Sequence, residues 1–130
     1  MEIEELATIA VDCCYNLHRE IGPGLLETVY ETVLAYELGA RGLTVARQVA
    51  VPINYKGLQI ENAFKADIIV NHKLVIELKS TESHMPVHAK QLLTYLRLLD
   101  LRLGLLMNFG APTFQQGIKR IANRHVEAKC

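Results

Sequence analysis

The chain has 130 residues, of which 50% are hydrophobic, and its 14 basic side chains balance 14 acidic ones. This length and composition predict a single globular domain over residues 1–130 and exclude a disordered chain. The zero net charge argues against tight, nonspecific nucleic-acid binding by the isolated monomer, since dedicated nucleic-acid binders carry a basic excess.

The first forty residues predict two helices. Apolar residues recur at helical spacing over residues 3–20, until Gly22-Pro23-Gly24 breaks the pattern. A second helix is predicted from about 25 to 40. Acidic residues near the start do not fit a signal peptide, and no apolar run reaches the roughly 20 residues that span a membrane. We therefore expect a cytoplasmic protein with no membrane association. Its three cysteines lack framework spacing and are expected to be reduced: Cys13, Cys14 and Cys130.

The rest of the chain predicts strands around one further helix. Pro86 favours the first turn of a helix that runs to about Leu99, and Thr113 is a candidate cap for a last helix over about 114–124. The element order is then ααβββαβα, an α/β fold in which helices flank both faces of a mixed β-sheet. The predicted strands are residues 43–54, residues 58–63 continuing into 64–70, residues 73–79 and residues 103–109.

Three charged residues interrupt two of these apolar strands. Asp67 lies in Ala66–Val70, and Glu77 and Lys79 lie in Val75–Lys79. Glu77 and Lys79 share a face because side chains alternate along a strand. A loop of odd length, such as residues 71–73, or a bulge would place Asp67 opposite Glu77, whereas a two-residue loop would place them on opposite faces. We predict the odd-length loop or a bulge, because only then do the three residues converge.

Two carboxylates beside a lysine suit metal-assisted hydrolysis of a phosphodiester. Carboxylate oxygens are ligands for Mg²⁺ or Mn²⁺, and water and a substrate phosphate complete the coordination. A lysine beside them can orient the attacking water and stabilise the transition state. The alternative interpretation is a structural salt-bridge network formed by Asp67, Glu77 and Lys79 at the end of the sheet.

The strand order with Asp67 and Glu77-Leu78-Lys79 resembles the PD-(D/E)XK nuclease superfamily. Gly24-Leu25-Leu26-Glu27-Thr28-Val29-Tyr30 resembles the signature of the GxxExxY proteins, and the similarity covers about residues 3–122. Further agreement comes from Ile21-Gly22-Pro23-Gly24, from Pro86-Val87-His88 leading to Gln91–Leu96, and from Gly104–Gly110. Phe64-Lys65 departs mildly from the expected aromatic-arginine pair.

The resemblance implies a Mg²⁺-dependent nuclease, or one using Mn²⁺. We expect nucleic acid as its substrate, with DNA favoured over RNA. Asp67 and Glu77 match metal-binding acids, Lys79 matches the catalytic lysine, and Glu27 matches a helix carboxylate that helps to hold the metal. Gln91 and Tyr95 resemble the QxxxY motif of RecB-type nucleases. Their i, i+4 spacing places both on one face of a helix, where they would orient the scissile phosphate.

Several of these residues also have plainer interpretations. Glu27 is a first-turn glutamate of the kind that a helix dipole favours, and Glu31, one turn later, is expected to be solvated. Tyr30 and Tyr95 are expected to be core aromatics whose hydroxyls reach the edge of the site. The basic residues near the C-terminus are interpreted as a solvated helix face or as phosphate contacts: Lys119, Arg120, Arg124 and Lys129.

Two functional alternatives stay open. The same fold would also serve as a non-catalytic module that binds nucleic acid or a protein, and the zero net charge favours this. The second alternative is an oligomer, in which the apolar N-terminal helix is the candidate face of a homodimer. His84 and His88 lack further zinc ligands, and His88 is a candidate phosphate contact.

Overall fold

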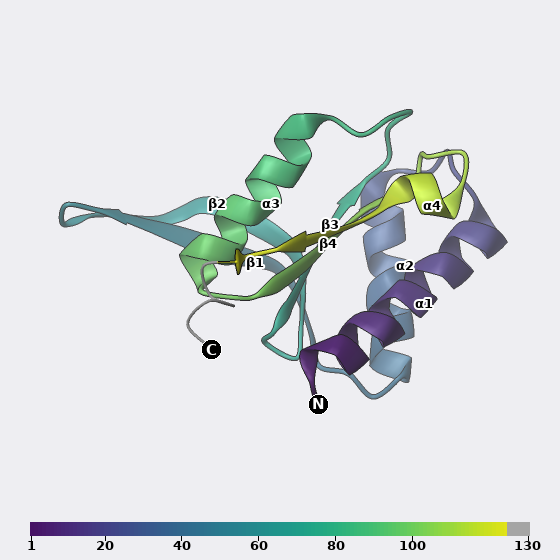
Figure 1. The fold of residues 1–130 in the computed structure, drawn as a ribbon, viewed down its shortest axis with the longest axis horizontal. Helices are drawn as coiled ribbons and strands as arrows, with labels where there is room; N and C mark the ends of the chain where they lie inside the picture. Colours follow the sequence, from purple (N-terminus) through teal and green to yellow (C-terminus); the bar gives the residue numbers. More distant parts are fainter. Residues whose placement is uncertain (125–130) are drawn as a thin grey trace.

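A computed structural model describes residues 1–124 and shows a mixed five-stranded sheet in the order β1-β2-β3-β4-β5. The first three strands form an antiparallel meander, β3 and β4 are parallel, and β5 runs antiparallel to β4. In Figure 1, α1 and α2 cover one face of the sheet and α3 covers the other. The elements are α1 (Ile3–Ile21), α2 (Glu27–Ala40), β1 (Val45–Tyr55), β2 (Leu58–Val70), β3 (Leu74–Lys79), α3 (Pro86–Leu99), β4 (Leu103–Asn108), α4 (Phe114–Gly117) and β5 (Ile118–Ala122). The predicted mixed sheet flanked by helices is confirmed.

The larger core lies between the sheet and the helix pair α1–α2. The apolar stripe of α1 is buried in this core, so it does not provide the dimer face that the sequence suggested. Homodimerisation stays a prediction without that interface. Cys13 and Cys14 are buried free thiols, and burial raises the pKa of both, whereas Cys130 lies outside the described residues. Among residues 1–124, no helix has the length and hydropathy to cross a membrane.

The smaller core lies between the sheet and α3. Leu92, Tyr95 and Leu96 of α3 pack on Val75 and Leu106 of the two central strands. Glycine at position 104 permits the close approach of helix and sheet, because a Cβ there would lie 2.9 Å from a methyl of Leu92. The sequence boundaries of α3 are confirmed from Pro86 to Leu99.

The predicted C-terminal helix over residues 114–124 is wrong beyond its first turn. Thr113 caps α4 by accepting a hydrogen bond from the Gln116 amide, but the helix ends at Gly117 and β5 follows. β5 pairs with β4, so it satisfies main-chain groups of β4 that would otherwise lie unpaired. A Cβ at position 117 would lie 2.5 Å from the carbonyl oxygen of Asn108, so glycine is needed where α4 leads into β5.

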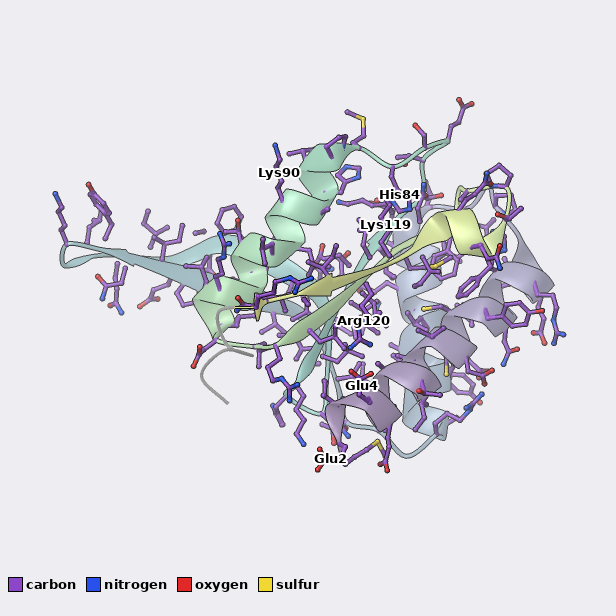
Figure 2. All side chains as sticks on the ribbon, in the orientation of Figure 1. Glu2, Glu4, His84, Lys90, Lys119 and Arg120 are labelled. Carbon is purple, nitrogen blue, oxygen red and sulfur yellow. The ribbon has the colours of Figure 1, made fainter. Side chains whose placement is uncertain are left out.

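Of the C-terminal basic residues, Lys119 and Arg120 therefore lie on an edge strand and not on a helix, and Arg124 lies beyond the end of that strand. Arg120 of β5 donates a hydrogen bond of 3.0 Å from Nη1 to Oε2 of Glu4 in α1, and Figure 2 shows the two side chains facing each other. This ion pair joins the first helix to the last strand. Lys129 lies outside the described residues.

Candidate active site

The turn between β2 and β3 sets the relation between the two acidic residues. Residues 71–73 form the turn, with left-handed φ values of 50° at Asn71 and 58° at His72. The strands pair from Val70 with Leu74 to Ile68 with Ile76, so the next position along this register places Asp67 opposite Glu77. The predicted odd-length loop is confirmed.

β2 and β3 separate at these two residues, and the carboxylates occupy the fork. The paired register ends at Ile68 and Ile76, whereas β3 continues beside β4 as far as Lys79. Glu77 Oε1 accepts a hydrogen bond of 2.8 Å from the Asp67 amide, and Asp67 Oδ2 accepts one of 2.9 Å from the Leu78 amide. Each carboxylate is thus fixed by the main chain of the opposite strand.

A glutamine on β1 extends this row across a third strand. Gln48 falls opposite Asp67 in the β1–β2 register and has a left-handed φ of 50°. Its Nε2 donates to Asp67 Oδ1 at 3.3 Å and to Glu31 Oε1 at 2.5 Å. Gln48 therefore links the strand carboxylate to helix α2, a connection that the sequence did not reveal.

Glu31 is not solvated as expected. It is 7% exposed, and its Oε2 accepts a hydrogen bond of 3.0 Å from Nε of Arg47. The donors that compensate its burial, Arg47 and Gln48, lie on β1. The pattern of α2 alone therefore did not indicate that Glu31 is buried. Its position one turn after Glu27 was the available signal.

Both strands of the β1–β2 hairpin change face at Gln48 and Asp67. At the open end of the hairpin, away from its turn at residues 56–57, alternate side chains pack toward α1 and α2, and on the turn side of Gln48 and Asp67 they pack toward α3. The side chains that show this are Val45 of β1 and Ile68 and Val70 of β2 on the first side, and Val49, Val51, Phe64 and Ala66 on the second. Normal alternation is therefore interrupted at Asp67. The turn end of the β1–β2 hairpin extends away from the body of the molecule (Figure 1).

The electrostatics of the fork favour a bound cation. Burial, followed by the negative charge of Asp67, raises the pKa of Glu77 to about 8, while the charge of Lys79 acts in the opposite direction. Two carboxylates share this small space, and Glu77 is 4% exposed. A divalent ion would neutralise their repulsion, and two carboxylates with water and phosphate are a common Mg²⁺ environment. The donor set therefore fits the metal ion.

Among the described residues, Lys79 is not part of the salt-bridge network that the sequence left as the alternative interpretation. It is half-buried, on the face that Glu77 occupies, and among residues 1–124 it forms no salt bridge. Its charge lowers the pKa of both Glu77 and His88. His88 lies close to this charge, and burial is the largest cause of its lowered pKa.

Tyr95 of α3 lies near enough to the two carboxylates to be affected by their charges, and Gln91 lies beside the Tyr95 hydroxyl on the same helix. Burial, together with the charges of Glu77 and Asp67, raises the pKa of Tyr95 to about 12, so the phenol stays protonated as a hydrogen-bond donor. Its ring lies 5.4 Å from that of Phe64, which makes it a core aromatic beside the site, as expected.

Glu27 lies apart from the two strand carboxylates. It is exposed in the first turn of α2, and among residues 1–124 no three His, Cys, Asp or Glu side chains are grouped to hold a metal ion. Tyr30, at the end of the same motif, instead has a structural contact. Its ring stacks on Phe109 with centroids 4.3 Å apart, and its hydroxyl donates to the carbonyl of Gly22 in the loop before α2.

A family model of the PD-(D/E)XK nuclease superfamily matches residues 4–121. The chain therefore belongs to the PD-(D/E)XK nuclease superfamily, whose members are generally nucleases that use divalent metal ions and act on nucleic acid. The comparisons with curated proteins and with solved structures gave no match.

Proposed function

We propose that this protein is a Mg²⁺-dependent nuclease, with Mn²⁺ as an alternative ion, that hydrolyses phosphodiester bonds in DNA rather than RNA. Within the superfamily we assign it to the GxxExxY proteins, on the residues from Gly24 to Tyr30. The observation that carries the function is the fork between β2 and β3, where Asp67 and Glu77 are held by main-chain amides beside Lys79. Fixed carboxylates of this kind need no rearrangement to bind an ion.

Asp67 and Glu77 are the proposed metal ligands, and Glu27 is proposed as a third that turns toward the site when substrate binds. When bound, the ion supplies an activated water and neutralises charge that develops on the phosphate. Lys79 orients the attacking water and stabilises the negative transition state. Gln91 and Tyr95 donate hydrogen bonds that hold the scissile phosphate in place.

A groove beside α3 supports this assignment of Gln91. A pocket of about 300 Å³ is lined by Phe64 of β2 and by Val87, Lys90, Gln91 and Thr94 of α3. Gln91 belongs both to this groove and to the helix face that approaches the carboxylates. Lys90 is exposed there, where its charge suits a phosphate backbone. We propose that one nucleic-acid strand lies along this groove.

A second candidate is a non-catalytic module that binds nucleic acid or a protein on the same fold. The separation of Glu27 from the two strand carboxylates in residues 1–124 favours it, since no group of three metal ligands is preformed there. Occupation of the Asp67–Glu77 pair by Mg²⁺ separates the two candidates, because a binding module does not require the ion.

Cleavage of four substrates tests the function: linear DNA, circular DNA, single-stranded DNA and RNA. Each is incubated with Mg²⁺, Mn²⁺ or EDTA. Lys79→Ala is compared with Lys73→Ala, which removes an exposed lysine at the other end of β3. We expect metal-dependent cutting that Lys79→Ala abolishes and Lys73→Ala retains. Cutting that survives in Lys79→Ala indicates a contaminant, and no cutting of any substrate favours the binding module.

A further inference from the structure

A second pocket lies at the carboxyl ends of the parallel strands β3 and β4. Its volume is about 250 Å³, and its lining includes Glu82 and His84 from the segment after β3, Asn108 from β4 and Gln116 from α4. Asn108 is the register partner of Lys79, so the pocket begins one strand away from the proposed catalytic lysine. Ligands commonly bind at the carboxyl ends of parallel strands.

Asn108 presents a buried hydrogen-bond donor that no described residue accepts. The side chain is 0% exposed. Its Oδ1 accepts hydrogen bonds of 3.0 Å from the amides of both Thr81 and Gly110. These two bonds fix which end of the amide is oxygen, so Nδ2 is the end that has no partner within residues 1–124. Leaving a buried donor unpaired costs free energy, which a ligand with an acceptor oxygen would recover.

Two further donors line the same pocket. Both ring nitrogens of His84 are buried and have no partner within the described residues, and in either tautomer one of them carries a hydrogen. Gln116 Oε1 accepts from the Thr113 hydroxyl at 3.1 Å, which leaves its amide nitrogen for another acceptor. Figure 2 shows His84 between the start of α3 and α4. Glu82 is the acidic residue of this lining, and it is exposed.

We propose, on the basis of the nuclease function above, that this pocket binds a second phosphate group of the nucleic-acid strand that is being cut. A phosphate offers only acceptor oxygens, which matches the donors of Asn108, His84 and Gln116. Neighbouring strands lie about 4.8 Å apart, so the pocket is one short step from Lys79. A phosphate held in this pocket determines which phosphodiester bond of the nucleic-acid strand lies beside Asp67 and Glu77.

The first test measures phosphate binding without cleavage. Inorganic phosphate is titrated in EDTA, and the Thr81 and Gly110 amides and the His84 ring are followed by NMR. Asn108→Asp keeps the acceptor oxygen for both amides and replaces the donor by a carboxylate oxygen. We expect shifts at these groups and at least about a tenfold weaker affinity in Asn108→Asp, as the loss of a hydrogen bond to a charged group implies.

His84→Gln provides a second variant, and it tests the pocket even if Asn108→Asp does not fold, because the His84 ring has no hydrogen-bond partner to lose within residues 1–124. Its matched control is His72→Gln, which changes an exposed histidine in the turn at the opposite end of β3. We expect weaker phosphate binding in His84→Gln and unchanged binding in His72→Gln. Normal thermal unfolding of each variant shows that the fold is intact.

Short single-stranded DNA with and without a 5′ phosphate, also in EDTA, identifies the source of the phosphate. If the 5′ phosphate increases the affinity and Asn108→Asp abolishes this increase, the pocket binds a terminal phosphate. If both DNAs bind with equal affinity and Asn108→Asp weakens the binding of both, the pocket binds an internal phosphodiester. If phosphate and both strands bind Asn108→Asp and His84→Gln as tightly as they bind the unmodified protein, the pocket has no such role. Because no arm requires cutting, these outcomes are independent of whether the nuclease activity itself is found.

Discussion

Asp67 and Glu77 each bind the main chain of the strand that carries the other. The Glu77 carboxylate accepts from the Asp67 amide at 2.8 Å, and the Asp67 carboxylate accepts from the Leu78 amide at 2.9 Å. The carboxylates thereby replace the ladder hydrogen bonds at the point where β2 and β3 diverge. Both stabilise the end of the strand pair and present oxygens to the same space, so structure and proposed chemistry depend on the same two side chains.

Glu77→Gln is expected to abolish activity without unfolding the protein. The amide oxygen of glutamine still accepts from the Asp67 amide, and the substitution removes a carboxyl whose ionisation burial opposes. We expect cleavage to fall by at least about a hundredfold, because the charge that holds the ion is lost. Thermal unfolding at pH 8 should be unchanged or occur at a higher temperature. Glu61→Gln, on the exposed part of the hairpin, is the matched control and should cleave normally.

Stability without metal is expected to fall as the pH rises. The pKa of Glu77 is about 8 in the folded protein against an ordinary value of 4.5, so the folded state binds more protons than the unfolded state between these values. This contribution is fully present below pH 4.5 and is lost as the pH rises through about 8. Thermal unfolding in EDTA between about pH 5 and about pH 9, the range over which this carboxyl titrates, measures the loss of this contribution. The slope should be much smaller in Glu77→Gln.

Added Mg²⁺ should reverse this trend. The ion binds the ionised carboxylates of Asp67 and Glu77, so its stabilising effect grows as the pH rises. We expect the increase in unfolding temperature caused by Mg²⁺ to be larger at pH 8 than at pH 6, and to be absent in Glu77→Gln. An equal increase in that variant would place the ion elsewhere in the molecule.

Gln48→Ala tests the bridge between Glu31 and Asp67. Alanine meets the same left-handed φ of 50° as glutamine, so the comparison mainly reports the lost side chain. Asp67 Oδ1 then loses the donor at 3.3 Å, and Glu31 loses the donor to Oε1 but keeps the hydrogen bond from Arg47 to Oε2. We expect about 1–2 kcal/mol lower stability and a reduced affinity for Mg²⁺, measured by urea unfolding and calorimetry.

The control for this bridge is Gln59→Ala, which removes an exposed glutamine from the same hairpin. Its stability and its Mg²⁺ affinity should match those of the unmodified protein. If Gln48→Ala behaves like this control in both measurements, Gln48 has no part in positioning Asp67.

The sequence predicted the relation between Asp67 and Glu77 because strand alternation and loop length are local properties. The burial of Glu31 was not predictable in this way, since it depends on hydrogen bonds from Arg47 and Gln48, which lie on β1 and not on the same helix. β5 was missed for a related reason. Residues 118–122 have no strong strand pattern, and they form a strand because β4 offers an unpaired edge. Tertiary pairing therefore decided what local preference left open.

Tyr30→Phe separates the two contacts of this side chain. Phenylalanine keeps the stacking on Phe109, but the loop before α2 loses the hydroxyl that binds the Gly22 carbonyl and, at 3.3 Å, the Leu25 amide. We expect about 1–2 kcal/mol lower stability, because the two groups lose their partner, and faster amide exchange in the loop. Tyr36→Phe is the control, since Tyr36 on the same helix is 76% exposed. Equal stability of the two variants would show that the hydroxyl of Tyr30 does not hold the loop.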